Sequence, residues 1–245
     1  RGWEGQRGSL STDEIRALVA GAVVWGRGEG REGGGVLEIN LAEMDLGDGD
    51  ICAVAQELHE VLVNRLLDAD LQAKVAMAVK LNNNRCGANG MAAICSVLTS
   101  ICHLDMFGDN SPYVRSFWLH RNELDDCAAS ALALFLKRQV AVGADAQCVV
   151  REVHLSHNIV TNTGAAALIE AARESGIYPL QRGNGRVPLW LRLHDTRVRF
   201  ELLAPHLLSV CCSLSDQRCK AHGCVCRAAV HLPKAGGGQL YRPAR

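Results

Sequence analysis

The chain has 245 residues, of which 48% are hydrophobic and 21% charged, a composition that excludes a predominantly disordered protein. Its 26 basic and 26 acidic residues balance, so the sequence lacks the positive charge of a general nucleic-acid-binding protein, and nucleic acid is not an expected partner. The longest apolar stretch near the start, residues 17–25, is too short to cross a bilayer, and no membrane partner is expected.

Residues 1–35 are predicted to form an N-terminal capping helix followed by a linker. Ser11 and Glu14 have the spacing of a capping box at the start of a helix over residues 11–25. The glycine-rich stretch 25–35 contains G-x-G-x-x-G at Gly28, Gly30 and Gly33, a pattern typical of dinucleotide-binding turns. That motif requires a helix directly after it, whereas more glycines and a strand pattern follow here. We therefore interpret the stretch as a flexible linker.

A repeat occupies residues 36–210, with one leucine in each unit as its reference point. These leucines are Leu41, Leu81, Leu119, Leu155 and Leu193. The residue two positions earlier is apolar in every unit, and this alternation predicts a short strand with one buried side. A polar or glycine-bearing link then predicts a helix start, and the helix is expected to bury an alanine and the aliphatic residue that follows it, such as Ala93 and Ile94.

Three units have an asparagine three residues after the reference leucine. These are Asn84, Asn122 and Asn158. An asparagine amide can bond the backbone of a neighbouring turn, so we expect these residues to have a structural role where each strand ends. Met44 and Thr196 stand at the same position in the first and fifth units, which are therefore expected to be divergent end units.

The pattern L-x-L-x-x-N followed by an alanine-containing helix resembles the leucine-rich repeat in its ribonuclease-inhibitor-like subclass. The resemblance implies an α/β solenoid of about five irregular units, with a curved parallel sheet inside, helices outside, and insertions between the units. It also implies a non-catalytic module that binds a protein partner on its concave strand face.

Strand alternation predicts which side chains form that face, because residues one before and one or two after the reference leucine point away from the helices. The predicted partner-binding residues are Lys80, Asn82, Trp118, His120, Arg121, His154, His157, Arg192 and His194. Tryptophan and arginine are the side chains that most often anchor interfaces, and Trp118 stands out in a chain with only 4% aromatic residues. The alternative reading is that Trp118 packs beneath an insertion and the histidines are solvated.

The resemblance implies one alternative function, because this repeat subclass includes the Ran GTPase activator. In that case Arg85 or Arg197, each one residue past the asparagine position, would act on the nucleotide of a GTPase. The chain contains no serine-hydrolase elbow, zinc-protease motif or phosphate-binding loop, and we expect no enzymatic activity of its own.

Residues 211–245 are predicted to form a cysteine-rich cap or tail. Possible zinc ligands there are Cys211, Cys219, Cys224, Cys226 and His222. The simpler alternative is a closing cap whose thiols bind no metal, and a zinc-stabilised tail that contacts nucleic acid is a further alternative. No other cofactor is expected. Six other cysteines lie within the apolar pattern as free buried thiols would, which favours a reducing intracellular location, cytoplasmic or nuclear.

Overall fold

The computed structural model describes residues 10–26, 36–68, 74–139, 148–182, 185–213, 219–220, 223–224 and 228–232. The helices are α1 (Thr12–Ala22), α2 (Asp48–Asp68), α3 (Ala88–Cys102), α4 (Asp126–Arg138), α5 (Asn162–Glu174) and α6 (Pro205–Leu208), with short 3-10 turns η1 (Asp105–Asn110) and η3 (Phe200–Leu202). The strands are β1 (Val23–Gly26), β2 (Val36–Asn40), β3 (Ala76–Lys80), β4 (Tyr113–Trp118), β5 (Glu152–His154), β6 (Leu180–Arg182), β7 (Gly185–Val187), β8 (Leu189–Arg192), β9 (Cys211–Ser213), β10 (Cys219–Lys220), β11 (Gly223–Cys224) and β12 (Val230–Leu232).

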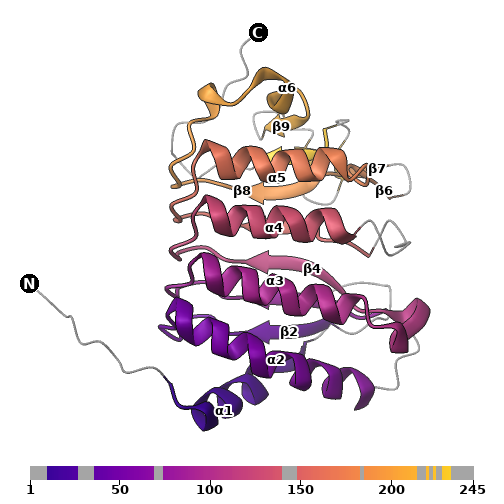
Figure 1. Ribbon diagram of the computed structural model, residues 1–245. Helices are drawn as coiled ribbons and strands as arrows, with labels where there is room; N and C mark the ends of the chain where they lie inside the picture. The colour runs from indigo at the N-terminus through magenta and orange to yellow at the C-terminus, as the bar shows by residue number, and fades with distance from the viewer. Residues whose placement is uncertain are drawn as a thin grey trace, which may run out of the picture.

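The main sheet has the strand order β1-β2-β3-β4-β5-β8-β12-β9. Strand β1 is antiparallel to β2, and every other pairing described in this sheet is parallel. Helices α2, α3, α4 and α5 lie side by side in chain order along the sheet (Figure 1). The α/β class and the largely parallel sheet that the sequence predicts are therefore confirmed.

The core lies between this sheet and its row of helices, and the reference leucines point into it. Four of the five are fully buried, and Leu193 is 3% exposed. The predicted helix pattern is half correct. The aliphatic residue, such as Ile94 or Leu132, is fully buried, but the alanine before it is only half-buried. The buried face of the helix instead continues with the residue after the aliphatic one, such as Ala133. The helical period of 3.6 residues places the alanine that precedes the aliphatic residue at the side of the helix.

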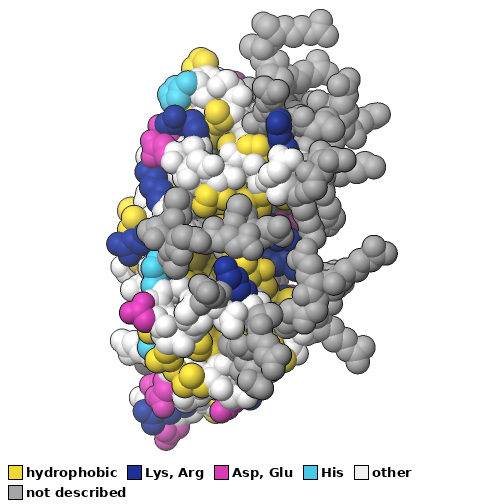
Figure 2. All heavy atoms as spheres, turned by 90° about the vertical axis from the view of Figure 1, so that its right-hand side faces the viewer, with side chains coloured by type: hydrophobic (Ala, Val, Ile, Leu, Met, Phe, Trp, Pro, Cys, Tyr) yellow, Lys and Arg dark blue, Asp and Glu magenta, His cyan; other side chains and the backbone are white. Residues whose placement is uncertain are grey.

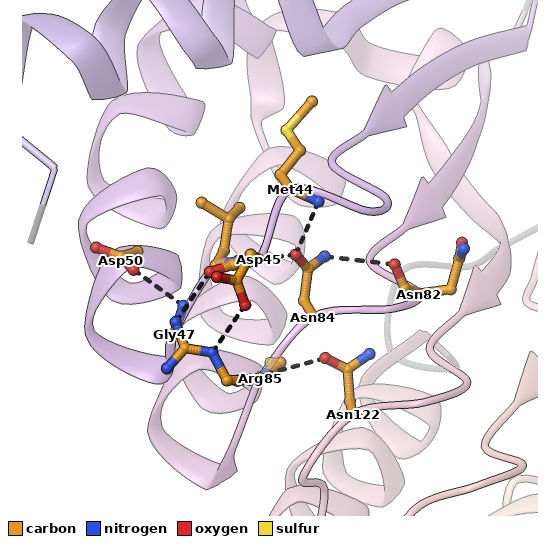
Figure 3. A network of polar contacts seen from close by, with 10 residues as sticks. Met44, Asp45, Gly47, Asp50, Asn82, Asn84, Arg85 and Asn122 are labelled. Carbon is orange, nitrogen blue, oxygen red and sulfur yellow. Dashed lines mark hydrogen bonds and ion pairs between the residues drawn. The ribbon is translucent and has the colours of Figure 1, made fainter. Parts of the chain in front are cut away.

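The asparagines join each unit to the one before it (Figure 3). The Asn84 amide nitrogen donates to the carbonyl oxygens of Leu41 (2.7 Å) and Leu81 (2.9 Å), and its oxygen accepts from the backbone N–H of Leu46 (3.0 Å). Asn122 and Asn158 make the equivalent bonds one and two units further along. All three side chains are buried, so they satisfy backbone groups that water does not reach.

The direction of these bonds explains why the first unit lacks the asparagine. The side chain reaches back to a preceding turn, and before the first unit the chain forms α1 and the antiparallel β1 instead of such a turn. Met44 therefore has no backbone turn behind it to satisfy. In the fifth unit the Thr196 hydroxyl bonds only within its own turn, donating to Leu193 O (2.6 Å) and accepting from Val198 N–H (3.4 Å).

A second link connects the start of one helix to the start of the next. Asp48, the first residue of α2, accepts from the backbone N–H of Gly90 in α3 (2.7 Å), and Asp126, the first residue of α4, accepts from Gly164 in α5 (3.0 Å). The first N–H groups of a helix have no partner within it and carry the positive end of its dipole, so a carboxylate there is stabilising. These aspartates cap the neighbouring helix, a contact that the repeat alignment did not predict.

The predicted capping box is present at α1, where Ser11 and Glu14 bond each other's backbone N–H groups. The helix ends at Ala22, however, and not at residue 25. Residues Val23–Gly26 form an edge strand instead, because Val23 and Val24 are β-branched and can pair with β2. Gly28, Gly30, Gly33 and the rest of the predicted linker over 27–35 lie outside the described residues.

The predicted boundary at residue 210 does not separate two structural units. Strand β12 pairs with β8, and β9 pairs with β12, so residues on both sides of the boundary belong to one sheet. Strands β6, β7, β10 and β11 form a second, antiparallel sheet. In the part of the chain that the structure describes, none of the helices combines the length and apolar character that crossing a membrane requires.

Candidate functional site

The face of the main sheet opposite the helices, here called the strand face, carries a row of side chains that are neighbours across the strands. The pairing register places Asn40, Lys80, Trp118, His154 and Arg192 side by side. Neighbouring strands lie about 4.8 Å apart, so adjacent side chains in this row can touch. Four of the predicted partner-binding residues are therefore brought together in one line.

Trp118 and His154 form the centre of this row. Their rings stack with centroids 4.4 Å apart and an angle of 29° between planes. His154 is only 3% exposed and Trp118 is half-buried, so His154 lies on the predicted face of the sheet but is covered there. His154 lies between Trp118 and Arg192 on the two neighbouring strands, and the stacked indole ring covers it. The Glu152 carboxylate also lies 3.6 Å from His154 Nε2.

The remaining predicted residues lie in the turns that follow the strands. Arg121 and His157 are exposed, and Asn82, His120 and His194 are half-buried. The residue two positions after the reference leucine has a left-handed backbone in every unit, at Glu43 (φ 63°), Asn83 (57°), Arg121 (57°), His157 (55°) and Asp195 (54°). Because all five units share this conformation, it belongs to the turn itself, and non-glycine side chains are held there at some cost in backbone strain.

Charges along the strand face are mixed. Lys80 pairs with Glu38 on the neighbouring strand (2.6 Å), and His157 lies 3.5 Å from the Asp195 carboxylate. Burial lowers the pKa of His120, with smaller contributions from neighbouring positive groups, and burial also lowers the pKa of His194, where the nearby Asp195 carboxylate partly opposes it. Both imidazoles are therefore neutral near pH 7, and the strand face can meet a partner through stacking and hydrogen bonds as well as through charge.

Three further residues of the strand face were not predicted to belong to it. Trp190, His231 and Cys212 are cross-strand neighbours in β8, β12 and β9. The Trp190 and His231 rings are 4.5 Å apart, and His231 Nδ1 lies 3.2 Å from Cys212 Sγ. Trp190 could have been found by extending the strand alternation two residues back from Arg192. No signal in the sequence places β12 beside β8, because the repeat pattern ends before it.

The His231 imidazole should make the fold less stable in acid. Burial lowers its pKa from the ordinary value of 6.5, and its ring is enclosed by Trp190 and Cys212. Between the folded and unfolded pKa values the unfolded chain binds more protons, so the free energy of unfolding falls as pH falls below 6.5, by at most about 1.4 kcal/mol per pH unit for one proton.

Urea unfolding at several pH values between 7.5 and 5 measures this slope. The imidazoles of His120 and His194 and the carboxyl groups of Glu14 and Glu174 also have lowered pKa values and contribute with the same sign, so the comparison is with His231→Phe, whose ring still stacks but cannot be protonated. We expect a shallower slope in this variant. An unchanged slope would show that His231 does not contribute to the pH dependence.

The predicted zinc ligands in the tail are only partly placed. Cys211 is half-buried and donates to Leu207 O (3.3 Å), and burial raises the pKa of its thiol to about 12, which disfavours the thiolate that zinc requires. Cys219 and Cys224 face each other in the backbone register of β10 and β11. His222 and Cys226 lie outside the described residues.

The two arginines of the GTPase-activation alternative differ in their settings. Arg85 is bound to its neighbour, with Nε 3.1 Å from the Asp45 carboxylate and a second bond to the Asp45 carbonyl oxygen (Figure 3). An arginine that acts on a nucleotide must reach outward, and Arg85 would first have to leave this pair. Arg197 is exposed, and its backbone N–H donates to Val160 O (2.9 Å).

A small cavity lies at the other end of the units, where the helices end. It has a volume of about 100 Å³ and is lined by Tyr113 and Phe135 together with Lys74, His103 and Arg138. Figure 2 views the molecule from this side and shows basic and hydrophobic side chains interspersed. This volume is well below the several hundred Å³ of a typical small-molecule site, so the strand face is the stronger candidate.

No protein-family model matches the sequence, and comparison with curated proteins found no match. The functional conclusion therefore rests on the geometry of the strand face.

Proposed function

We propose that the chain is a leucine-rich-repeat solenoid of the ribonuclease-inhibitor-like kind and that it is a non-catalytic module that binds a protein partner on the strand face. The repeated strand, asparagine turn and helix support the fold assignment. Stacked units of this kind offer a preformed extended surface, and binding specificity then depends on the side chains along the strands and turns.

The observation that carries the functional proposal is the row centred on Trp118. Its ring is held against His154, and the Arg192 guanidinium lies over the Trp190 ring, 5.9 Å from its centroid. Ordering these side chains before a partner arrives lowers the entropy cost of binding. Exposed Arg121 lies in the turn that follows Trp118 and adds a second residue type that anchors interfaces.

A protein fits this surface better than a nucleic acid, because it carries acidic as well as basic groups. Glu38 pairs with Lys80, Glu43 accepts from Asn83 and Asp195 lies beside His157, and these carboxylates would repel a phosphate backbone. We also propose an intracellular, cytoplasmic or nuclear location. Cys86 and Cys95 are free thiols buried in the core, and such thiols are typical of a reducing compartment.

Trp118→Ala should weaken binding of the partner by about 30-fold, or about 2 kcal/mol, because it removes the central anchor of the row. The full chain would be immobilised to capture partners from a cell extract, and the dissociation constant of each captured protein would be measured by calorimetry with the wild type and the variant. Thermal unfolding would show that the variant remains folded.

Trp25→Ala is the matched control. Trp25 is 42% exposed on β1, but its register with the buried Leu37 places it on the helix side of the sheet. Binding should be unaffected by this change. If both variants bind as the wild type does, the strand face is not the interface, and if both weaken binding equally, the effect of Trp118→Ala is not specific to the strand face.

A further inference from the structure

The turns of the fourth and fifth units bring two histidines and one aspartate together at the end of the strand face. His157 and Asp195 occupy the same left-handed position in adjacent units, with φ values of 55° and 54°. The backbone N–H of His157 donates to the carbonyl oxygen of His194 (3.2 Å), which ties the two turns to each other. The cluster is thus fixed by the parallel register of the units and not by a single flexible loop.

The side chains of this cluster lie close enough together to bind one metal ion. One nitrogen or oxygen from each of His157, His194 and Asp195 lies within 4.8 Å of the other two. His157 Nε2 is 3.5 Å from Asp195 Oδ2, close to the separation of about 3.4 Å between two ligands of a tetrahedral zinc ion. The histidine rings meet edge to face with centroids 5.8 Å apart, and His194 Nδ1 is a buried nitrogen without a hydrogen-bond partner among the described residues.

The surroundings admit a cation. His157 and Asp195 are exposed and His194 is half-buried, which leaves a coordination position open to solvent. Asp195 supplies negative charge at the cluster. The Arg192 guanidinium lies over the Trp190 ring, 5.9 Å from its centroid, and its charge acts less on His194 than the Asp195 carboxylate does. Imidazole nitrogens with one carboxylate select zinc and its transition-metal neighbours over magnesium or calcium, which prefer oxygen ligands.

We propose that His157, His194 and Asp195 form a binding site for a divalent transition-metal ion of the zinc class, with a fourth position open to water or to a side chain of a partner. The site goes beyond the proposed protein-interaction function, because the ion would bind the isolated chain.

The test is zinc titration of the reduced full chain in competition with a chromogenic chelator, with no partner present. The wild type should bind one zinc ion at this site. His157→Ala and Asp195→Asn should each lower its affinity by about 100-fold, the upper end of what loss of a merely supporting partner costs. Asp195→Asn preserves shape and suits the left-handed backbone, so it separates loss of a ligand from misfolding.

Two controls separate this site from the tail and from nonspecific binding. His206→Ala removes an exposed histidine on α6 and should leave zinc affinity unchanged. Cys219→Ser/Cys224→Ser/Cys226→Ser removes the competing tail thiols and should retain the ion. Cobalt bound in this triple variant should show no thiolate charge-transfer absorption. The proposal is overturned if the chain binds no zinc, if binding survives both ligand variants, or if it disappears in the triple variant.

Discussion

Replacing Asn122 with alanine is expected to lower the free energy of unfolding by about 3 kcal/mol, because the buried Cys86 N–H would lose its partner and the Leu81 and Leu119 carbonyl oxygens would each lose one of two amide donors. The Asn122 amide donates to the carbonyl oxygens of Leu81 (2.9 Å) and Leu119 (3.1 Å), and its oxygen accepts from Cys86 N–H (2.9 Å). The side chain is only 8% exposed, so water would not easily replace these bonds. Urea unfolding monitored by circular dichroism measures the change.

Two variants separate this effect from a general sensitivity of the turn. Asn122→Asp keeps the shape but places a carboxylate against two carbonyl oxygens, so at pH 7 it should cost at least as much as alanine. Asn40→Ala removes an exposed asparagine whose bond to Ala42 N–H is long (3.3 Å), and should cost less than about 0.5 kcal/mol. Equal losses for Asn122→Ala and Asn40→Ala would rule out the role assigned to the asparagine link.

Gly164→Ala is expected to destabilise the fold by about 3 kcal/mol, combining overpacking with the loss of a charged helix cap. A methyl group on Gly164 would lie 2.6 Å from Asp126 Oδ1 and 2.8 Å from Ala129 Cβ. One of these two neighbouring atoms must therefore shift. If the Asp126 carboxylate moves away, it loses its hydrogen bonds to the start of α5, including the one from Thr161 N–H (2.7 Å). Thermal and urea unfolding would both report the loss.

Gly21→Ala provides the matched control on α1. A methyl group there meets no atom within 4 Å, so the better helix propensity of alanine should raise stability by about 0.5–1 kcal/mol. In an Asp126→Ala background, Gly164→Ala should cost less than in the wild type, because one of the two clashing atoms is gone. Equal costs in both backgrounds would show that the carboxylate is not the obstacle.

The repeat period allowed much of the fold to be predicted, because the same short-range pattern had to recur in each unit. Leu81, Leu119 and Leu155 lie where the alternation put them, at the ends of neighbouring parallel strands. The asparagine at a constant offset indicated a turn bonded to its neighbour. The pattern did not reveal the contact between Asp126 and Gly164, because it joins residues of two different units and its counterpart, Asp48 with Gly90, recurs only two units away.

The sequence predicted which residues belong to the candidate site but not how their side chains contact one another. Alternation identified the side of the strand on which Trp118 and His154 lie, yet it treated both as exposed. Which ring covers the other depends on strand spacing and on side-chain rotamers. The position of His231 beside Trp190 depends on β12 entering the sheet next to β8, a long-range pairing without a periodic signal.

By itself, the sequence determined the succession of strand, turn and helix, the residues that face the core, and the direction in which the strand-face side chains leave the backbone. These properties follow from periods of 2 and 3.6 residues and are local. Tertiary structure alone decided that His154 lies under Trp118, that Arg85 is engaged by Asp45, and that His157, His194 and Asp195 converge. The physical reason is that these contacts join different units, so they depend on how the units pack against each other and not on the pattern within any one of them.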